Sequence, residues 1–193
     1  HIEARCDQAL GRDFTVKQLE DRYDAVILAI GAWKAKGLRV AGEDHPRVFG
    51  GIDYLREVAL GRAVDLGQDV IVVGGGNTAI DAARSARRQG CRVTLVYRRS
   101  RQEMPAEACE IVDAEEEGVA YEFLVAPTGL RFDGDRLVGM ECLRMELGEP
   151  DSSGRRSPVP IAGSDFVILA DAVIKAIGQD IEPGVIPASE VDQ

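Results

Sequence analysis

The chain has 193 residues, enough for one substantial core or for one domain with pieces of a second. Apolar residues make up 45% and charged residues 29%, as in a globular protein, and no apolar run approaches the roughly 18 residues that span a bilayer. The net charge of −10 argues against a nucleic-acid partner, because phosphate backbones bind to positive surfaces. We therefore expect neither a membrane nor a nucleic acid as partner.

The four cysteines indicate reduced thiols. Cys6, Cys91, Cys109 and Cys142 are far apart and form no C-x-x-C pair. This spacing fits neither a zinc site nor a disulfide framework. We expect no metal site and a cytoplasmic location.

Two nine-residue stretches are nearly identical. "DAVILAIGA" begins at Asp24 and "DAVIKAIGQ" begins at Asp171, with no other similarity between their surroundings. We predict that each is a short buried strand that stops at a glycine, Gly31 in the first copy and Gly178 in the second. Between them, the Gly-rich residues 41–51 indicate a connection between domains, and the apolar spacing in residues 51–63 predicts a short helix.

The next segment predicts a βαβ unit. Residues 69–73, "DVIVV", are typical of a strand buried on both faces of a parallel sheet. Residues 74–90 change to a helical period and end at Gly90, and residues 91–97 form a second strand. A strand, helix and strand within about 30 residues are typical of a doubly wound sheet.

The rest of the chain predicts one more helix and then antiparallel strands. Residues 103–118 favour a helix with Pro105 in its first turn and a solvated run, Glu115–Glu117, at its end. Residues 121–126, 137–147 and 166–170 are predicted as antiparallel strands joined by hairpins. The predicted fold class is α/β: a three-layer Rossmann-like domain with an antiparallel β-meander.

The start of the predicted helix carries a dinucleotide fingerprint, Gly74-x-Gly76-x-x-Ala79. Gly74 allows the sharp turn, Gly76 lets the pyrophosphate approach the backbone, and Ala79 lets the helix lie close to the sheet. Free N–H groups at the helix start then face the diphosphate. The predicted cofactor-binding residues here are Gly74, Gly75, Gly76, Asn77, Thr78 and Ala79.

The end of the second strand favours NADP over NAD. An NAD site normally has a carboxylate there for the ribose hydroxyls, whereas this chain has "YRRSR". Seven of the 23 basic residues fall between Arg84 and Arg101; we interpret Arg84, Arg87 and Arg88 as a solvated helix face. Arginine binds phosphate by charge-assisted, bidentate hydrogen bonds, each contributing roughly 1.5–3 kcal/mol. The remaining candidates for the 2′-phosphate are Arg98 and Arg99, with Arg101 as the third choice.

Together these motifs resemble the NADPH-binding region of the glutamate synthase small (β) subunit and its relatives. The resemblance begins at "VVGGGNTAIDAARSARRQGCRVTLVYRRSRQEMPAEACEIVDAEEEGV" and continues through "APTGL", "RMELGEPDSSGRRSPVPIAGS" and "ADAVIKAIGQ". It covers nearly the whole chain. The relatives include the NADPH end of dihydropyrimidine dehydrogenase and ferredoxin-NADP transhydrogenase subunits.

The resemblance implies a thioredoxin-reductase-like plan, in which an NADPH domain is inserted into an FAD domain. Residues 1–44 are then the end of the first FAD-domain segment with its crossover, 45–168 the NADPH domain, and 169–193 the crossover back. The two repeated stretches would be the crossovers, and the second triplet, Ala176, Ile177 and Gly178, would border the NADP site. The FAD fingerprint and the Cys-rich iron–sulfur domain of the family are missing, so the flanks resemble stubs of a split FAD-binding domain.

The implied reaction is hydride transfer from NADPH to FAD, with electrons passing to iron–sulfur centres outside this segment and to a larger catalytic subunit or iron–sulfur partner. Such a reaction needs no general acid or base, so no catalytic residue is named, and His45 is assigned to the linker. A thioredoxin reductase is excluded by the missing C-x-x-C, and a short-chain dehydrogenase by the missing Tyr-x-x-x-Lys. By itself the segment is expected to be inactive, and a non-catalytic NADP(H)-sensing module stays open as the alternative.

Overall fold

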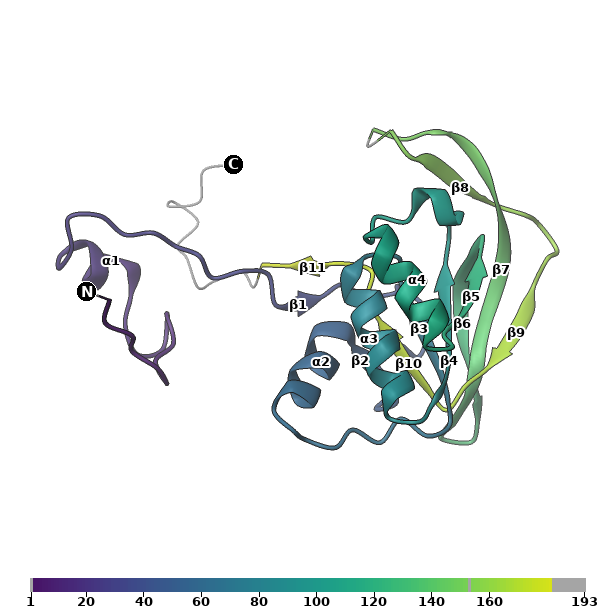
Figure 1. Ribbon diagram of the computed structural model, residues 1–193, viewed down its shortest axis with the longest axis horizontal. Coiled ribbons are helices and arrows are strands. Elements are labelled where there is room, and N and C mark those ends of the chain that lie inside the picture. Colours follow the sequence, from purple (N-terminus) through teal and green to yellow (C-terminus); the bar gives the residue numbers. More distant parts are fainter. Residues whose placement is uncertain (1, 153, 182–193) are drawn as a thin grey trace. The chain divides into compact units, whose positions relative to one another are not determined.

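The computed structural model describes residues 2–152 and 154–181, which belong to two compact units (Figure 1). Unit 2 is Ala35–Gln179, and unit 1 contains the described residues on either side of it. The predicted NADPH domain, 45–168, lies inside unit 2. Of the predicted return crossover, 169–193, residues 182–193 lie outside the described residues.

Unit 1 corrects one prediction. Its helix α1 (Val16–Glu20) is capped by the Thr15 hydroxyl, but the first repeated stretch, residues 24–30, is not a strand. Ile27 in this stretch is 91% exposed. An apolar extended segment becomes a strand only where another segment pairs with its backbone, and none of the described residues pairs with this one in a strand.

Unit 2 is built on a five-stranded, fully parallel sheet. The strand order is β2 (Val48–Gly50), β10 (Ala172–Lys175), β3 (Asp69–Val73), β4 (Arg92–Tyr97) and β5 (Ala120–Phe123). The second repeated stretch is therefore a buried strand, as predicted, and it lies beside β3. Residues 121–126 were expected to form one antiparallel strand, which is wrong for residues 121–123, because β5 pairs in parallel with β4. Residues 125–126 begin the next strand, which is antiparallel, as predicted.

Each face of the parallel sheet is covered by a different layer (Figure 1). One layer holds the helices α2 (Gly51–Ala59), α3 (Asn77–Arg88) and α4 (Ala108–Glu116), with the 3₁₀ turn η1 (Arg101–Glu103). The other is an antiparallel sheet of β6 (Val125–Asp133), β7 (Arg136–Pro150), β8 (Arg156–Pro160) and β9 (Phe166–Leu169). Two short strands, β1 (Lys34–Ala35) and β11 (Gln179–Asp180), pair with each other. The three-layer α/β fold with an antiparallel meander is confirmed.

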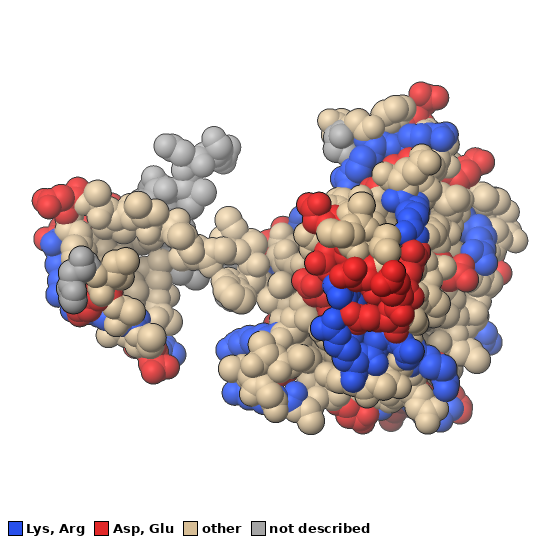
Figure 2. Space-filling model, in the orientation of Figure 1, with Lys and Arg blue, Asp and Glu red and all other residues tan. Residues whose placement is uncertain are grey.

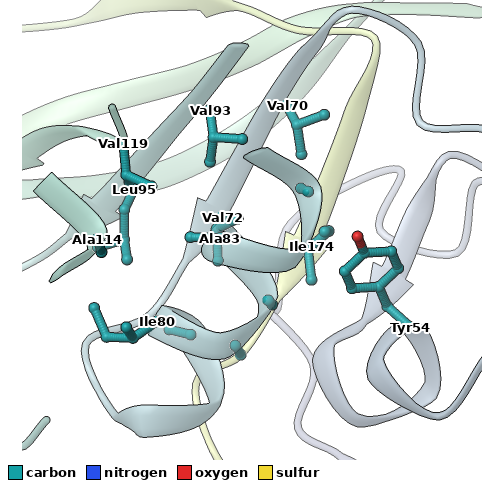
Figure 3. Packing of buried hydrophobic residues seen from close by; sticks show 14 of the residues in the cluster. Tyr54, Val70, Val72, Ile80, Ala83, Val93, Leu95, Ala114, Val119 and Ile174 are labelled. Carbon is teal, nitrogen blue, oxygen red and sulfur yellow. The ribbon is translucent and has the colours of Figure 1, made fainter. Parts of the chain in front are cut away.

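Alternating side chains of β3 fill both cores. Val70 and Val72 pack in the core below the helices, whereas Ile71 and Val73 pack in the core shared with the antiparallel sheet. Figure 3 shows the first core. A face of five buried residues, Ala79, Ile80, Ala82, Ala83 and Ala86, lets α3 lie close to the sheet, because alanine adds almost no thickness. In the same core, burial and the nearby Cys91 raise the pKa of the Tyr54 hydroxyl, which has no hydrogen-bond partner among the described residues, to about 12.

The last helix starts later than predicted. α4 begins at Ala108, and Pro105 precedes it in an extended connection. A residue before proline is pushed out of the helical region, and Met104 accordingly has φ −64° and ψ 126°. The N–H of Ala106 donates to the Gly75 carbonyl at 3.1 Å, so the connection lies against the glycine loop, Gly74–Gly76.

Arginines of α3 and acids at the end of α4 gather on one face of the molecule (Figure 2). Arg88, Glu115 and Glu116 are exposed, as predicted, whereas the pairing of Arg84 with Glu117 corrects their interpretation as solvated. Arg84, with a side chain only 17% exposed, donates to Glu110 at 2.5 Å and to Glu117 at 2.8 Å. Arg88 donates to the same Glu117 carboxylate at 2.5 Å. Arg87 instead donates to the backbone carbonyls of Glu117 and Cys91 at 3.0 and 2.7 Å. This cluster joins the two helices and is not a site for an added anion.

Glu117 makes the stability of the fold depend on acid pH. Hydrogen bonds from Arg88 and Arg84 lower its pKa from 4.5 to about 2. The stabilisation is complete above the unfolded pKa and is lost as pH falls through the folded pKa. We expect the urea-unfolding free energy of Glu117→Gln to fall less than that of the unchanged chain between pH 5 and pH 2. Glu116→Gln, at an exposed neighbouring position, is the control; equal slopes for both variants would contradict the pairing.

No helix among the described residues is long and apolar enough to cross a bilayer. In residues 2–152 and 154–181, no three His, Cys, Asp or Glu side chains come together as metal ligands. All four cysteines are free thiols: Cys91 and Cys142 are buried, and Cys6 and Cys109 are exposed.

Candidate nucleotide-binding site

A cavity of about 510 Å³ lies at the carboxyl ends of β3, β4 and β10 within unit 2. Ligands of open α/β sheets bind at this edge, where connections from adjacent strands diverge. Its lining combines residues of the glycine loop, the end of β4 and the segment after β10 with apolar residues of β6. The lining residues are Leu38, Val73, Gly74, Gly75, Gly76, Thr78, Val96, Tyr97, Arg98, Arg99, Pro105, Val125, Ala126, Pro127, Arg155, Ala176, Ile177, Gly178 and Gln179.

Two of the three loop glycines are required by packing against other residues of this chain. Gly74 has φ +154°, and a Cβ there would overlap the carbonyl oxygen of Ala176 and lie 3.0 Å from the Cβ of Ala79. A Cβ on Gly75 would overlap the ring of Tyr97. Packing alone therefore explains glycine at both positions.

Gly76 has no such packing reason. Its φ of −96° suits any residue, and a Cβ there would meet only Pro105, at 3.9 Å. Both residues line the cavity, so the Cβ would project into its open space. Glycine at this position leaves room for a group that lies against the backbone.

The start of α3 presents unused hydrogen-bond donors. No side chain caps this helix, and the N–H groups of Gly75, Gly76, Asn77 and Thr78 have no acceptor within the part of the chain that the structure describes. Together with the helix dipole they form a typical setting for a phosphate. Asn77 does not line the cavity; its side-chain oxygen accepts from the N–H of Glu107 at 3.0 Å.

The three candidate arginines have different surroundings. Arg98 is exposed and lines the cavity, and its guanidinium makes no hydrogen bond or ion pair with any described residue. Arg99 also lines the cavity but is 4% exposed, and its guanidinium donates to Asp151 at 2.5 Å. Arg101 lies outside the cavity lining, where its guanidinium pairs with Glu115. Only Arg98 among them combines access to the cavity with an uncommitted guanidinium.

The segment after β10 lines the cavity beside the glycine loop. The N–H of Ala176 donates to the Val73 carbonyl at 2.8 Å, which holds this segment beside the glycine loop. Ile177 is 44% exposed, and the Gly178 carbonyl accepts from the N–H of Lys36 at 3.0 Å. The structure thus brings Ala176, Ile177 and Gly178 to the same cavity as residues 74–76.

Arg155 is a cavity residue that the sequence interpretation missed. It lies between β7 and β8, 57 positions after Arg98, in a polar Gly- and Ser-containing turn. The motif "GRRSP" was part of the family resemblance, but nothing local indicated which arginine would reach the cavity. His45, by contrast, is not part of the lining; its Nε2–H donates to the Asp135 carbonyl at 2.9 Å.

The chain is similar in sequence to a known protein family and to several of its members. The sequence profile of the family "Pyridine nucleotide-disulphide oxidoreductase" matches residues 3–191. The NADPH-Fe(3+) oxidoreductase subunit beta of Geobacter sulfurreducens is 50% identical over 186 residues, covering 94% of this chain and 28% of that protein. The Azospirillum brasilense glutamate synthase [NADPH] small chain is 39% identical and covers 92% of this chain and 39% of that protein.

Among solved structures, the thioredoxin reductase of T. acidophilum has a TM-score of 0.56 at 18% identity, covering 79% of this chain and 44% of that one. This likeness concerns the fold alone. The resemblance to glutamate synthase small subunits is confirmed by the curated relatives, of which the chain spans about a quarter to two-fifths of the length. The chain belongs to the pyridine nucleotide-disulphide oxidoreductase family.

Proposed function

We propose that this chain is the NADPH-binding part of an FAD-dependent oxidoreductase that passes hydride from NADPH to FAD and electrons on to iron–sulfur centres. The observation that carries the proposal is the cavity of unit 2, where free N–H groups of the α3 start, an unobstructed Gly76 and the uncommitted Arg98 meet. These groups suit a diphosphate and a further phosphate. The nicotinamide supplies the hydride, while residues of this chain bind and orient the nucleotide.

NADPH fits the residues present. The diphosphate is assigned to the N–H groups of Gly75, Gly76, Asn77 and Thr78, and the adenosine 2′-phosphate to Arg98. Apolar residues after β10 and on β6 would cover the rest of the nucleotide. At the end of β4, where an NAD site has a carboxylate, this chain has Arg98, so the preference is for the phosphorylated nucleotide.

FAD does not fit the described residues alone. Residues 24–33 leave Ile27, Leu28 and Trp33 exposed, by 91%, 39% and 62%, instead of enclosing a flavin. We therefore assign unit 1 to an FAD-binding part that cannot enclose a flavin by itself. Two similar proteins are a subunit beta and a small chain, which supports a larger partner subunit. Free thiols agree with a cytoplasmic setting.

Calorimetric titration with NADPH and NADH at fixed ionic strength tests the proposal. We expect NADPH to bind at least about tenfold more tightly, a difference of ~1.4 kcal/mol. Arg98→Glu removes the phosphate partner and adds repulsion, so it should abolish the preference while leaving NADH binding unchanged. Arg131→Glu, with the same charge change on an exposed β6 residue outside the cavity lining, is the matched control. Equal binding of both nucleotides by the unchanged chain would contradict the proposed NADP preference.

A further inference from the structure

The buried arginine at the end of β4 is committed to the connection between β7 and β8. Arg99 Nη2 donates to the Asp151 carboxylate at 2.5 Å, and its Nε donates to the Arg156 carbonyl at 2.7 Å. With its side chain only 5% exposed, this guanidinium has its charge matched by the neighbouring carboxylate. It therefore offers a ligand phosphate less net charge than an unpaired arginine would.

These two bonds hold the chain on both sides of Arg155. Asp151 and Arg156 flank Arg155, and the N–H of Asp151 donates to the Arg155 carbonyl at 2.8 Å. Arg156 in turn binds the β7 carbonyls of Leu147 and Gly148 at 2.6 and 3.1 Å. The backbone of Arg155 is thus fixed to the end of β4.

The backbone of Arg99 strengthens the same link. Its carbonyl accepts from the N–H of Leu124 at 3.1 Å, and the Leu124 carbonyl accepts from the N–H of Met145 on β7 at 2.7 Å. Leu124 has φ +56°, which is uncommon for a large side chain and marks the point where the chain leaves the parallel sheet. Side chain and backbone of Arg99 therefore both tie the antiparallel sheet to the cavity edge.

We propose that Arg155 binds the 2′-phosphate of NADPH together with Arg98, and that Arg99 is a positioning residue that holds Arg155 at the cavity. The inference rests on the proposed function and replaces the adjacent pair Arg98–Arg99 by a pair brought together from distant parts of the chain. Both Arg98 and Arg155 line the cavity that contains the glycine loop. Two guanidinium groups from different elements can bind a phosphate dianion from two directions.

The test compares Arg155→Gln with Arg131→Gln in the 193-residue chain, titrated with NADPH and NADH at fixed ionic strength. Arg155→Gln should weaken NADPH binding about tenfold and leave NADH binding within about twofold, since NADH lacks the 2′-phosphate. Arg131→Gln makes the same charge change outside the cavity lining and should alter neither affinity. A retained NADPH preference in Arg155→Gln overturns the inference and leaves the proposed function standing.

The positioning role of Arg99 has its own readout. Arg99→Gln should reduce the NADPH-to-NADH preference, and the double variant Arg99→Gln/Arg155→Gln should lose no more than about twofold beyond Arg155→Gln, because both act through one contact. Losses that multiply would show that Arg99 binds phosphate independently and would overturn its positioning role. If Arg99→Gln does not fold, Arg155→Gln alone decides the inference. An unchanged chain that binds neither nucleotide, or both equally, overturns the inference together with the proposed NADP preference.

Discussion

Gly76→Ala should weaken the binding of NADPH and NADH alike by about 100-fold, or ~2.7 kcal/mol, with little change in stability. The new Cβ has an ordinary backbone conformation and meets only Pro105 at 3.9 Å, so the fold accommodates it. The space it fills is the part of the cavity in front of the free N–H groups, where the diphosphate is placed. Calorimetry measures the affinity, and urea unfolding measures the stability, which an alanine N-cap lowers by no more than about 1 kcal/mol.

Gly76→Ser separates the two effects. Its hydroxyl can cap α3, so stability should be kept or slightly raised, but its side chain occupies the same space and nucleotide binding should still be lost. Gly134→Ala, in the β6–β7 turn outside the cavity lining, is the control for nucleotide affinity alone, because its φ of +60° makes alanine destabilising there. Full NADPH affinity in Gly76→Ala would refute the assignment of the diphosphate to this loop.

Gly74→Ala should instead damage the fold, lowering the free energy of unfolding by about 3 kcal/mol or more. The added Cβ would overlap the carbonyl of Ala176, and φ at this position is +154°, a region that L-residues rarely adopt. Relief requires β10 and the start of α3 to move apart. In a domain of this size we expect the melting temperature to fall by at least about 6 °C.

Comparing the unfolding free energies of Gly74→Ala and Gly76→Ala tests whether the loss of stability comes from the position of the added methyl group. Both variants add one methyl group to the same loop, two residues apart, but only one adds it where backbone already lies. Equal stability of the two variants would show that Gly74 is not packed as described. Weak nucleotide binding by Gly74→Ala alone would be uninformative about the ligand, because the loop itself is distorted.

The sequence predicted best what is decided locally. The β3–α3–β4 unit was predicted close to its observed bounds, since the uninterrupted apolar run of β3, the alanine face of α3 and the φ +93° glycine at position 90 each depend on neighbouring residues. The second repeated stretch lines the same cavity as residues 74–76, which the family resemblance implied and no local pattern indicated.

Errors arose where a long-range partner decides the outcome. Residues 24–30 and the second repeated stretch have nearly the same sequence, yet only the second lies between pairing strands, β2 and β3. The direction of β5 depends on its neighbour β4, not on its own pattern. The sequence also could not distinguish the two adjacent arginines. Asp151, 52 positions away, pairs with the guanidinium of Arg99, whereas no described residue pairs with that of Arg98.

The most direct test of the central claim is amide NMR of the 193-residue chain during titration with NADPH. If the nucleotide binds where we place it, the largest shifts will be those of Gly75, Gly76, Asn77 and Thr78, whose N–H groups lack acceptors among the described residues, followed by Arg98 and residues 176–178. Residues 2–34 should change little. Shifts confined to residues 2–34, or no shifts at millimolar NADPH, would contradict an NADPH site at the start of α3.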